Sequence, residues 1–294
     1  MGNKFCIATL THSADRRDKF LQLTIKTFLE NTALPKVEWY IHCNGHDENI
    51  INVVNEAKEL YNERITFHFT ESENNGVGFG INKLNKQIQQ YEYVLFLEGD
   101  WITIPTDQNW LNGCLNYMEK NDIVDQILLR RYLHDVDDRQ FGFGYWIRED
   151  NVNFVDEQFL RLKKKEYTNN PYIRRNARFY DVGIFPLKEF YNEDGTPSEL
   201  KDQPMWGQAE IQAEGLGYKL ESAYLMMGVM VHCDHFPTYD DWEVLEQKKT
   251  KCQYYKECKY GYLFSNERFC GLCVKDASFS DLERHNQLYE RTYY

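Results

Sequence analysis

Residues 93–100 read Tyr-Val-Leu-Phe-Leu-Glu-Gly-Asp, and this stretch decides the fold. Its apolar residues run without a polar break and stop at two acids, Glu98 and Asp100. A short apolar run bounded by polar sequence predicts a strand that is buried on both faces of a sheet. Because open α/β sheets bind ligands beyond the carboxyl ends of their strands, we expect both acids at a ligand-binding edge.

The residues before this strand alternate between two periodicities. Strand patterns at 5–10, 37–43 and 65–69 are followed by helical patterns that contain residues 21–29, 50–61 and 81–88. Ser13 is the expected N-cap of the first helix. The alternation predicts an α/β fold with a doubly wound, mainly parallel sheet.

Polar residues gather just beyond the four predicted strands. Because these strands are parallel, the polar loops would converge at one edge of the sheet. The loop after the third strand also contains Gly76, Gly78 and Gly80, but its spacing is not that of a dinucleotide-binding Rossmann turn. The polar residues at this edge are Thr11, His12, Asn44, Asp47, the turn at 74–80, Glu98 and Asp100.

Composition narrows the classes of partner. The 294 residues include 46 acidic and 34 basic side chains, for a net charge of −12, which argues against nucleic acid as a partner. The sequence contains no apolar run of about 18 residues and does not begin like a signal peptide, so we predict no transmembrane segment. We therefore expect a cytoplasmic protein in which the eight cysteines are thiols or metal ligands.

The first hundred residues resemble GT-A-fold glycosyltransferases, in particular family 2. The turn carries that family's Asn-x-Gly pattern, and residues 98–100 are similar to its Asp-x-Asp motif. The residues that match the turn are Asn74 or Asn75, Gly76, Gly78 and Asn82. The resemblance implies a nucleotide-binding half with a Rossmann-like arrangement followed by an acceptor half. It also implies a nucleotide-diphosphate sugar donor bound with Mn²⁺ or Mg²⁺. The nucleotide-sugar contacts expected from position and resemblance are Thr11, His12, Asn44, Asp47, Asn75, Gly76, Asn82, Glu98, Gly99 and Asp100.

The metal ligands follow from the same resemblance. The first acid of the motif is Glu98 rather than Asp, so Asp100 is the expected direct ligand and Glu98 an assistant. An apolar run at 225–231 ends at His232, where the family often has a histidine that completes the metal's coordination, and His235 is the alternative. Imidazole, carboxylate and phosphate oxygens suit Mn²⁺ or Mg²⁺.

Two features of the second half suggest contacts with the acceptor. Residues 206–210 read Trp-Gly-Gln-Ala-Glu, which resembles the family's acidic motif, so Glu210 is the expected catalytic base, with Glu214 as the alternative. A base in this position implies an inverting reaction. Arg174, Arg175 and Arg178 are expected either to bind a diphosphate or anionic acceptor, or to form surface salt bridges.

The C-terminal segment has a different character from about residue 242 onwards. Cys252, Cys258, Cys270 and Cys273 suit a structural Zn²⁺ site, whereas two disulfides or four separate thiols are the alternatives. We expect a GT-A domain at 1–245, divided into a nucleotide-sugar half at 1–105 and an acceptor half at 106–245, and a Cys-rich appendage at 246–294.

The sequence as a whole predicts a metal-dependent glycosyltransferase, a hexosyl- or pentosyltransferase. It would move sugar from a nucleotide-diphosphate sugar to the hydroxyl of a glycan, protein or small-molecule acceptor. One alternative is a nucleotidyltransferase on a related fold, but its glycine-rich loop after the first strand is absent here. The other alternative is a non-catalytic carbohydrate-binding or scaffold protein.

Overall fold

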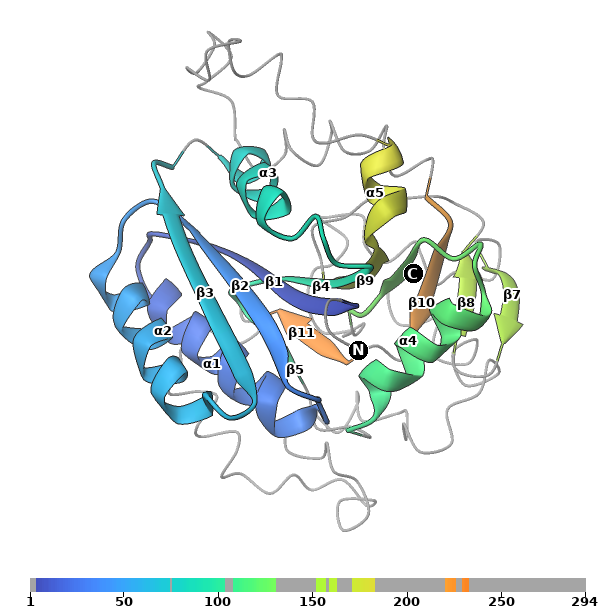
Figure 1. The fold of residues 1–294 in the computed structure, drawn as a ribbon, viewed down its shortest axis with the longest axis horizontal. Helices are drawn as coiled ribbons and strands as arrows, with labels where there is room; N and C mark the ends of the chain where they lie inside the picture. The colour runs from blue at the N-terminus through green and yellow to red at the C-terminus, as the bar shows by residue number, and fades with distance from the viewer. Residues whose placement is uncertain are drawn as a thin grey trace, which may run out of the picture.

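A nine-stranded sheet with helices on both faces forms the frame of the chain (Figure 1). The computed structural model describes residues 4–74, 76–103, 108–130, 152–156, 159–162, 171–182, 220–225 and 229–232. The strand order is β3-β2-β1-β4-β9-β6-β10-β8-β7. The strands of this sheet are β1 (Phe5–His12), β2 (Val37–Asn44), β3 (Ile65–Ser72), β4 (Tyr93–Glu98), β6 (Gln126–Leu128), β7 (Val152–Asp156), β8 (Phe159–Leu162), β9 (Tyr172–Arg175) and β10 (Ser222–Leu225).

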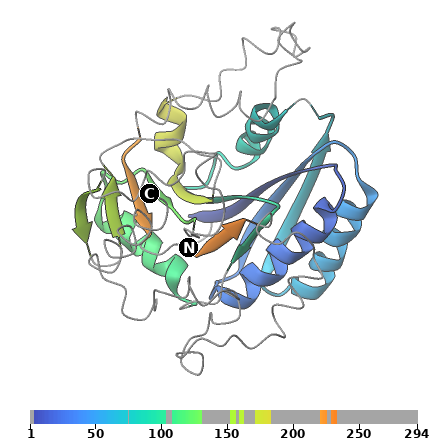
Figure 2. The same cartoon turned by 180° about the vertical axis from the view of Figure 1, so that it is seen from behind.

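The first four strands are parallel neighbours, as their periodicity predicted. Helices α1 (Arg17–Asn31) and α2 (Glu48–Tyr61) connect β1 to β2 and β2 to β3 in one direction across the sheet. Helix α3 (Val77–Gln87) then carries the chain back to β4, on the other side of β1. Because such crossovers are right-handed, reversing the direction puts α3 on the opposite face from α1 and α2, as Figures 1 and 2 show.

The later strands extend the same sheet beyond β4. Strand β9 lies antiparallel between β4 and β6, and β10 lies parallel to β6. Within the described strands of this sheet, only β8 and β9 run against the direction of β1. The prediction of a doubly wound, mainly parallel sheet is therefore confirmed. The sheet combines strands from both sides of residue 105, and residues 246–294 lie outside the described part.

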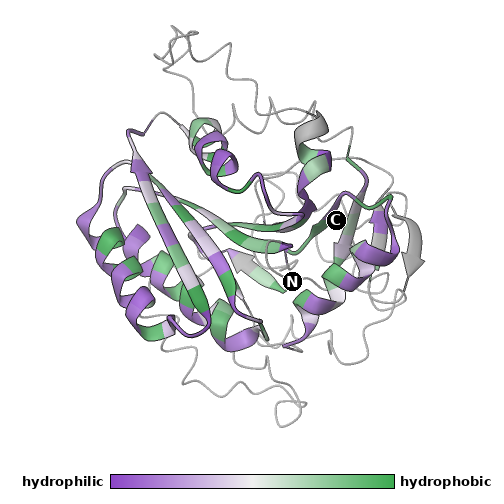
Figure 3. Cartoon of the chain, viewed as in Figure 1, coloured by the Kyte–Doolittle hydropathy of each residue, from purple (hydrophilic) through white to green (hydrophobic). Residues whose placement is uncertain are grey.

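Strand β4 is buried on both faces, as expected from its unbroken apolar run. Tyr93 to Leu97 are all buried, and exposure begins at Glu98. One face of the sheet packs against α1, α2 and α4 (Trp110–Lys120), and there Phe28 meets Trp39 and Trp110 edge to face. In Figure 3, hydrophilic and hydrophobic residues alternate along α1 and α2, as expected for helices with one face on a sheet. The other face is covered by α3 and by the short helix α5 (Asn176–Val182) (Figure 1).

A small two-stranded sheet adjoins the end of β4. Its strands, β5 (Trp101–Thr103) and β11 (Met230–His232), are antiparallel. The register places His232 opposite Trp101, so a residue from late in the chain lies beside the end of the central strand.

The first helix starts later than the sequence predicted. Helix α1 begins at Arg17 after Arg16, not after the predicted N-cap Ser13, because residues 13–16 form a turn that delays the helix.

None of the helices in the described ranges is long and apolar enough to cross a membrane.

Candidate functional site

The loops after β1, β2, β3 and β4 lie side by side at one edge of the sheet. Three hydrogen bonds between backbone groups tie them together: Gly99 N to Leu10 O at 2.8 Å, Ser13 N to Asn44 O at 2.9 Å, and Gly45 N to Ser72 O at 2.6 Å. The edge includes the carboxyl ends of β1 and β4, between which the strand order reverses. Such switch points are where open α/β sheets bind ligands.

Asp100 occupies the turn between β4 and β5, and its side chain is only 8% exposed. One carboxylate oxygen, Oδ2, lies 3.3 Å from Nε2 of His232 and also pairs with Nη1 of Arg17. The other oxygen, Oδ1, is buried and has no hydrogen-bond partner. A buried acceptor without a partner is costly, so this oxygen is suited to binding a ligand or ion.

The protonation state of Asp100 follows from its neighbours. Burial by itself would raise the pKa of this carboxyl, but His232 and Arg17 lower the pKa to about 2 through hydrogen bonds and charge. The carboxylate is therefore ionised at neutral pH. A buried, ionised oxygen acceptor is the type of group that hard divalent cations bind.

His232 reaches Asp100 because β11 pairs with β5. Its imidazole meets the ring of Trp101 edge to face, with the ring centroids 5.0 Å apart at 72°. The pairing of two short strands therefore brings together two residues that the sequence analysis assigned to the metal. Their role as metal ligands remains a prediction.

Arg17 is the residue at this site that the sequence analysis missed. It is the first residue of α1, and the preceding Arg16 adopts a left-handed backbone with φ of 66°. A non-glycine residue in this region is unusual and often occurs near functional sites. The available signal was the Arg-Arg pair directly after the first strand of an acidic chain.

His12 follows Thr11 at the end of β1 and belongs to the same group of side chains. Burial lowers the pKa of its imidazole, the charge of Arg17 lowers it further, and the charge of Asp100 partly opposes both. The neutral form of His12 is therefore favoured at neutral pH. A neutral imidazole can both donate and accept a hydrogen bond.

Gly99 allows the end of β4 to approach β1 closely. A Cβ atom at position 99 would lie 2.9 Å from both Cβ and Oγ1 of Thr11, closer than side-chain atoms normally approach. Thr11 Oγ1 is itself buried without a hydrogen-bond partner. The glycine between the two acids is therefore required by packing, which the sequence motif alone did not show.

Asn44 ends β2 and contacts the glycine-rich turn. Its Nδ2 donates to Gly76 O at 3.0 Å, whereas its buried Oδ1 has no hydrogen-bond partner. A Cβ on Gly80 would lie 2.5 Å from Asn44 Oδ1, so that glycine lets α3 pack against β2. Asn82 lies on α3, and Asn75 lies outside the described residues.

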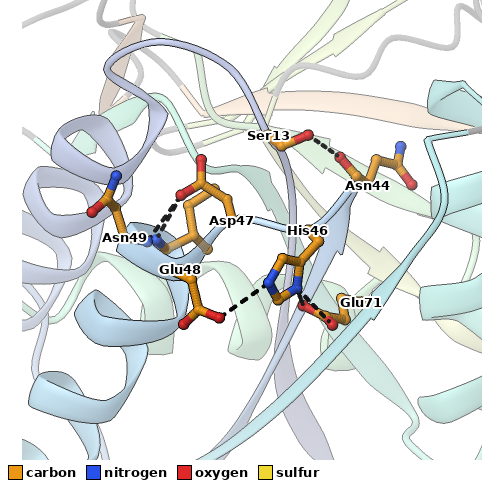
Figure 4. A network of polar contacts seen from close by, with 8 residues as sticks. Ser13, Asn44, His46, Asp47, Glu48, Asn49 and Glu71 are labelled. Atoms are coloured by element: carbon orange, nitrogen blue, oxygen red, sulfur yellow. Dashed lines mark hydrogen bonds and ion pairs between the residues drawn. The ribbon is translucent and has the colours of Figure 1, made fainter.

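Asp47 is engaged in capping a helix (Figure 4). Its carboxylate accepts hydrogen bonds from the backbone N–H groups of Asn49 and Ile50, at 2.9 and 3.4 Å, and so caps α2. Beside it His46 lies between Glu48 and Glu71, with nitrogen–oxygen distances of 3.0–3.1 Å (Figure 4). Asp47 therefore has a structural role as the N-cap of α2, and its contact with the nucleotide stays a prediction.

The three arginines of the second half are not gathered at this edge. Arg174 pairs with Val94 in the sheet, and Val94 lies roughly 13 Å along β4 from Glu98 at the usual strand rise. Arg174 and Arg175 are neighbours on β9 and so point to opposite faces of the sheet. Their contacts are Arg174 Nη2 to Asn85 Oδ1 at 2.7 Å, Arg175 Nη2 to Met118 O at 2.6 Å, and Arg178 Nε to Asp125 Oδ1 at 3.7 Å.

Other predicted residues cannot be placed at the site. The predicted base Glu210, its alternative Glu214, the alternative ligand His235 and the four cysteines Cys252, Cys258, Cys270 and Cys273 all lie outside the described residues. Glu98, the last residue of β4, is partly exposed. Its assistance to the metal stays a prediction.

The donor set fits a divalent metal that takes part of its coordination from a ligand. The described ranges contain no group of three or more His, Cys, Asp or Glu side chains arranged to hold a metal. Asp100 and His232 are instead a pair, and Asp100 Oδ1 is unpartnered. Mg²⁺ and similar ions commonly bind through one or two carboxylates together with substrate phosphates and water.

Comparisons with known proteins add to this geometry. No family model matches the chain, and no curated protein matches it in sequence. Among solved structures, it is similar to the mannosyltransferase PcManGT from Pyrobaculum calidifontis, in complex with GDP-Man and Mn²⁺. The identity is 12%, the TM-score is 0.52, and the match covers 81% of this chain and 59% of that one.

Two further solved structures are similar. GalNAc-T7 with UDP, GalNAc and Mn²⁺ matches at 11% identity and a TM-score of 0.50, over 97% of this chain and 55% of that one. Residues 1–349 of S. aureus TarS match at 14% identity over 82% of this chain and 64% of that one, but at a TM-score of 0.45. The chain thus spans less than two thirds of each of these structures. The first two likenesses show its fold, which is that of the GT-A glycosyltransferases.

Proposed function

We propose that this chain, which has the GT-A fold, is a metal-dependent glycosyltransferase. It would move a hexose or pentose from a nucleotide-diphosphate sugar to the hydroxyl of a glycan, protein or small-molecule acceptor. One observation carries the proposal. Asp100 lies at the point where the strand order reverses, its carboxylate is ionised, and one of its oxygens is buried without a hydrogen-bond partner in the protein.

In this proposal Asp100 and His232 hold Mn²⁺ or Mg²⁺, with help from Glu98. When bound, the ion supplies positive charge against the diphosphate that departs with the nucleotide. His232 is fixed against Trp101, and Asp100 is held by two neighbours, so little ordering of the protein is needed on binding. Preorganised groups of this kind stabilise developing charge better than mobile ones.

The ends of β1 and β2 would bind the nucleoside part of the donor. Thr11 Oγ1 and Asn44 Oδ1 are buried oxygens without hydrogen-bond partners, and both lie on the loops joined at this edge. Such oxygens can accept hydrogen bonds from ribose hydroxyls or from the amino or imino groups of a base. The remaining donor contacts are proposed for His12, Asp47, Asn75, Gly76, Asn82 and Gly99.

The acceptor hydroxyl must lose a proton as it attacks the anomeric carbon. We assign this step to Glu210, a carboxylate of the second half, and the reaction would then invert the configuration at that carbon. This assignment rests on the sequence resemblance. A Glu210→Gln variant that retains donor binding but loses transfer would support it.

The test of the proposal is nucleotide release from a panel of UDP- and GDP-sugars with Mn²⁺. The Asp100→Asn variant should lose Mn²⁺-dependent release by at least about 100-fold, because removing one oxyanion or metal contact commonly costs that much. The matched control is Asp122→Ala, which removes an acid at an exposed position. Full turnover by Asp100→Asn would refute the proposal.

The substrates consumed and the products released separate the alternative functions. A nucleotidyltransferase would consume a sugar phosphate with a nucleoside triphosphate and release pyrophosphate. A non-catalytic carbohydrate-binding protein would bind sugar nucleotides or glycans without turnover. UDP or GDP release that depends on both metal and acceptor is the outcome expected here.

A further inference from the structure

Arg17 makes a contact that differs from those of an ordinary surface arginine. Its side chain is 24% exposed, and its guanidinium pairs with Asp100, whose side chain is 8% exposed. The same guanidinium lies 5.9 Å from the centre of the Phe20 ring. It is therefore held at the ligand-binding edge while part of it remains open to solvent.

The contacts of Asp100 are unevenly divided between its oxygens. Arg17 and His232 both contact Oδ2, whereas Oδ1 has no hydrogen-bond partner. A divalent cation bound by this carboxylate would lie within a few ångströms of the guanidinium. Like charges at that separation repel strongly in a site shielded from water, so Arg17 and a metal ion compete for Asp100.

A diphosphate offers Arg17 a second partner at the same edge. The planar guanidinium binds phosphate oxygens with two parallel hydrogen bonds, and it carries a permanent charge. Arg17 is also the first residue of α1, where the free N–H groups of the helix favour an anion.

We propose that Arg17 is a displaceable counter-ion of Asp100. It neutralises the carboxylate in the donor-free protein and moves to the diphosphate when metal and donor bind. The inference rests on the proposed function, since it requires a metal at Asp100 and a diphosphate beside it. Metal and nucleotide would then bind cooperatively, because each removes the obstacle to the other, and the coupling must be reciprocal.

The test measures Mn²⁺ and nucleotide binding directly, without turnover. Free Mn²⁺ is followed by electron paramagnetic resonance in the absence and presence of UDP or GDP, and nucleotide affinity is measured by calorimetry at saturating Mn²⁺. In Arg17→Ala we expect Mn²⁺ alone to bind about tenfold more tightly and the nucleotide about tenfold more weakly, the usual size for a charged hydrogen bond.

Two further variants make the test specific. Lys19→Ala removes the same charge from an exposed position of α1 and should change neither affinity. Arg17→Lys keeps the charge but loses the planar fork, so it should weaken nucleotide binding while leaving Mn²⁺ binding near the wild-type value. If Arg17→Ala does not give a cooperative thermal unfolding transition, Arg17→Gln, which also removes the charge, takes its place with the same expected changes in both affinities.

Each remaining outcome counts against the inference. Unchanged or weaker binding of Mn²⁺ alone by folded Arg17→Ala would mean that Arg17 does not compete with the metal. Unchanged nucleotide affinity in that variant would mean that the guanidinium does not pass to the diphosphate. A wild-type protein that binds neither Mn²⁺ nor UDP or GDP would overturn the proposed function as well as this inference.

Discussion

The imidazole Nε2 of His232 lies 3.3 Å from Oδ2 of Asp100, although the two residues are separated by more than a hundred positions in the sequence. The contact exists because β11 pairs with β5 directly after the turn that holds Asp100. His232 thus contributes both to the electrostatics of the carboxylate and to the proposed metal site. The first prediction separates these two contributions.

Replacing His232 with Ala should weaken Mn²⁺ binding in the presence of UDP or GDP by about 10- to 100-fold, the usual effect of removing a group that supports a metal. The variant should remain folded, because the side chain is partly exposed and Arg17 still pairs with Asp100. His68→Ala is the control, since His68 lies in the middle of β3 and pairs with Glu38, the second residue of β2. Equal Mn²⁺ affinity in both variants would exclude His232 from the metal site.

Asp100 should make stability depend on pH in the acid range. Its pKa in the folded protein is about 2, below the ordinary value of 3.8, so the unfolded chain takes up a proton first as the pH falls. The stabilisation is complete above about pH 4 and is lost between about pH 4 and 2, with a magnitude of about 2 kcal/mol. Urea unfolding of wild type and Asp100→Asn at several pH values measures this difference. A constant difference between them across that range would contradict the prediction.

His42 should give a second pH dependence, in a higher range. Burial lowers the pKa of its imidazole to about 4, with a smaller contribution from Lys83. Because this folded pKa is below that of the unfolded chain, stability is complete above about pH 6.5 and falls as the pH drops towards 4. A titration of the imidazole by NMR should give a midpoint near 4.

Both ring nitrogens of His42 also have a hydroxyl group as a hydrogen-bond partner. Nδ1 lies 2.9 Å from Thr70 Oγ1, and Nε2 lies 3.1 Å from Ser72 Oγ. His42→Gln should remove the part of the stability loss between pH 6.5 and 4 that comes from His42, whereas His12, whose pKa is also lowered, still contributes. A midpoint near 6.5 in the wild-type protein would show that burial does not control this group.

Gly99→Ala should damage the site through packing. The new Cβ would meet Thr11 at 2.9 Å, so the turn that carries Asp100 must shift. We expect a loss of about 1–3 kcal/mol in the free energy of unfolding, which is typical of overpacking, together with weaker Mn²⁺ binding. Chemical unfolding and electron paramagnetic resonance measure the two effects.

Gly113→Ala is the matched control for that substitution. Gly113 lies within α4, and a Cβ there would meet no atom within 4 Å. Alanine is the better helix former, so this variant should be more stable by about 0.5–1 kcal/mol, with unchanged Mn²⁺ binding. If Gly99→Ala behaved like Gly113→Ala, the close approach to Thr11 would not limit the site.

Much of the fold was predictable from local patterns. The strands β1 to β4 and the helices between them follow from periodicity, and the burial of Tyr93 to Leu97 follows from their unbroken apolar run. The position of Asp100 at the edge where the first four strands end also follows, because parallel strands have their carboxyl ends at the same edge of a sheet. The start of α1 was not predictable, because Arg16 adopts a backbone conformation that its residue type does not favour.

The sequence by itself determined that four polar loops would share one edge of a parallel sheet, because hydrophobic periodicity records which face of each segment is buried. Only the tertiary structure decided which side chains meet there. The β5–β11 register brings His232 to Asp100, the turn before α1 brings Arg17 to the same oxygen, and β9 places Arg174 away from that edge. Such contacts depend on pairing between distant segments, whereas periodicity describes only neighbours along the chain.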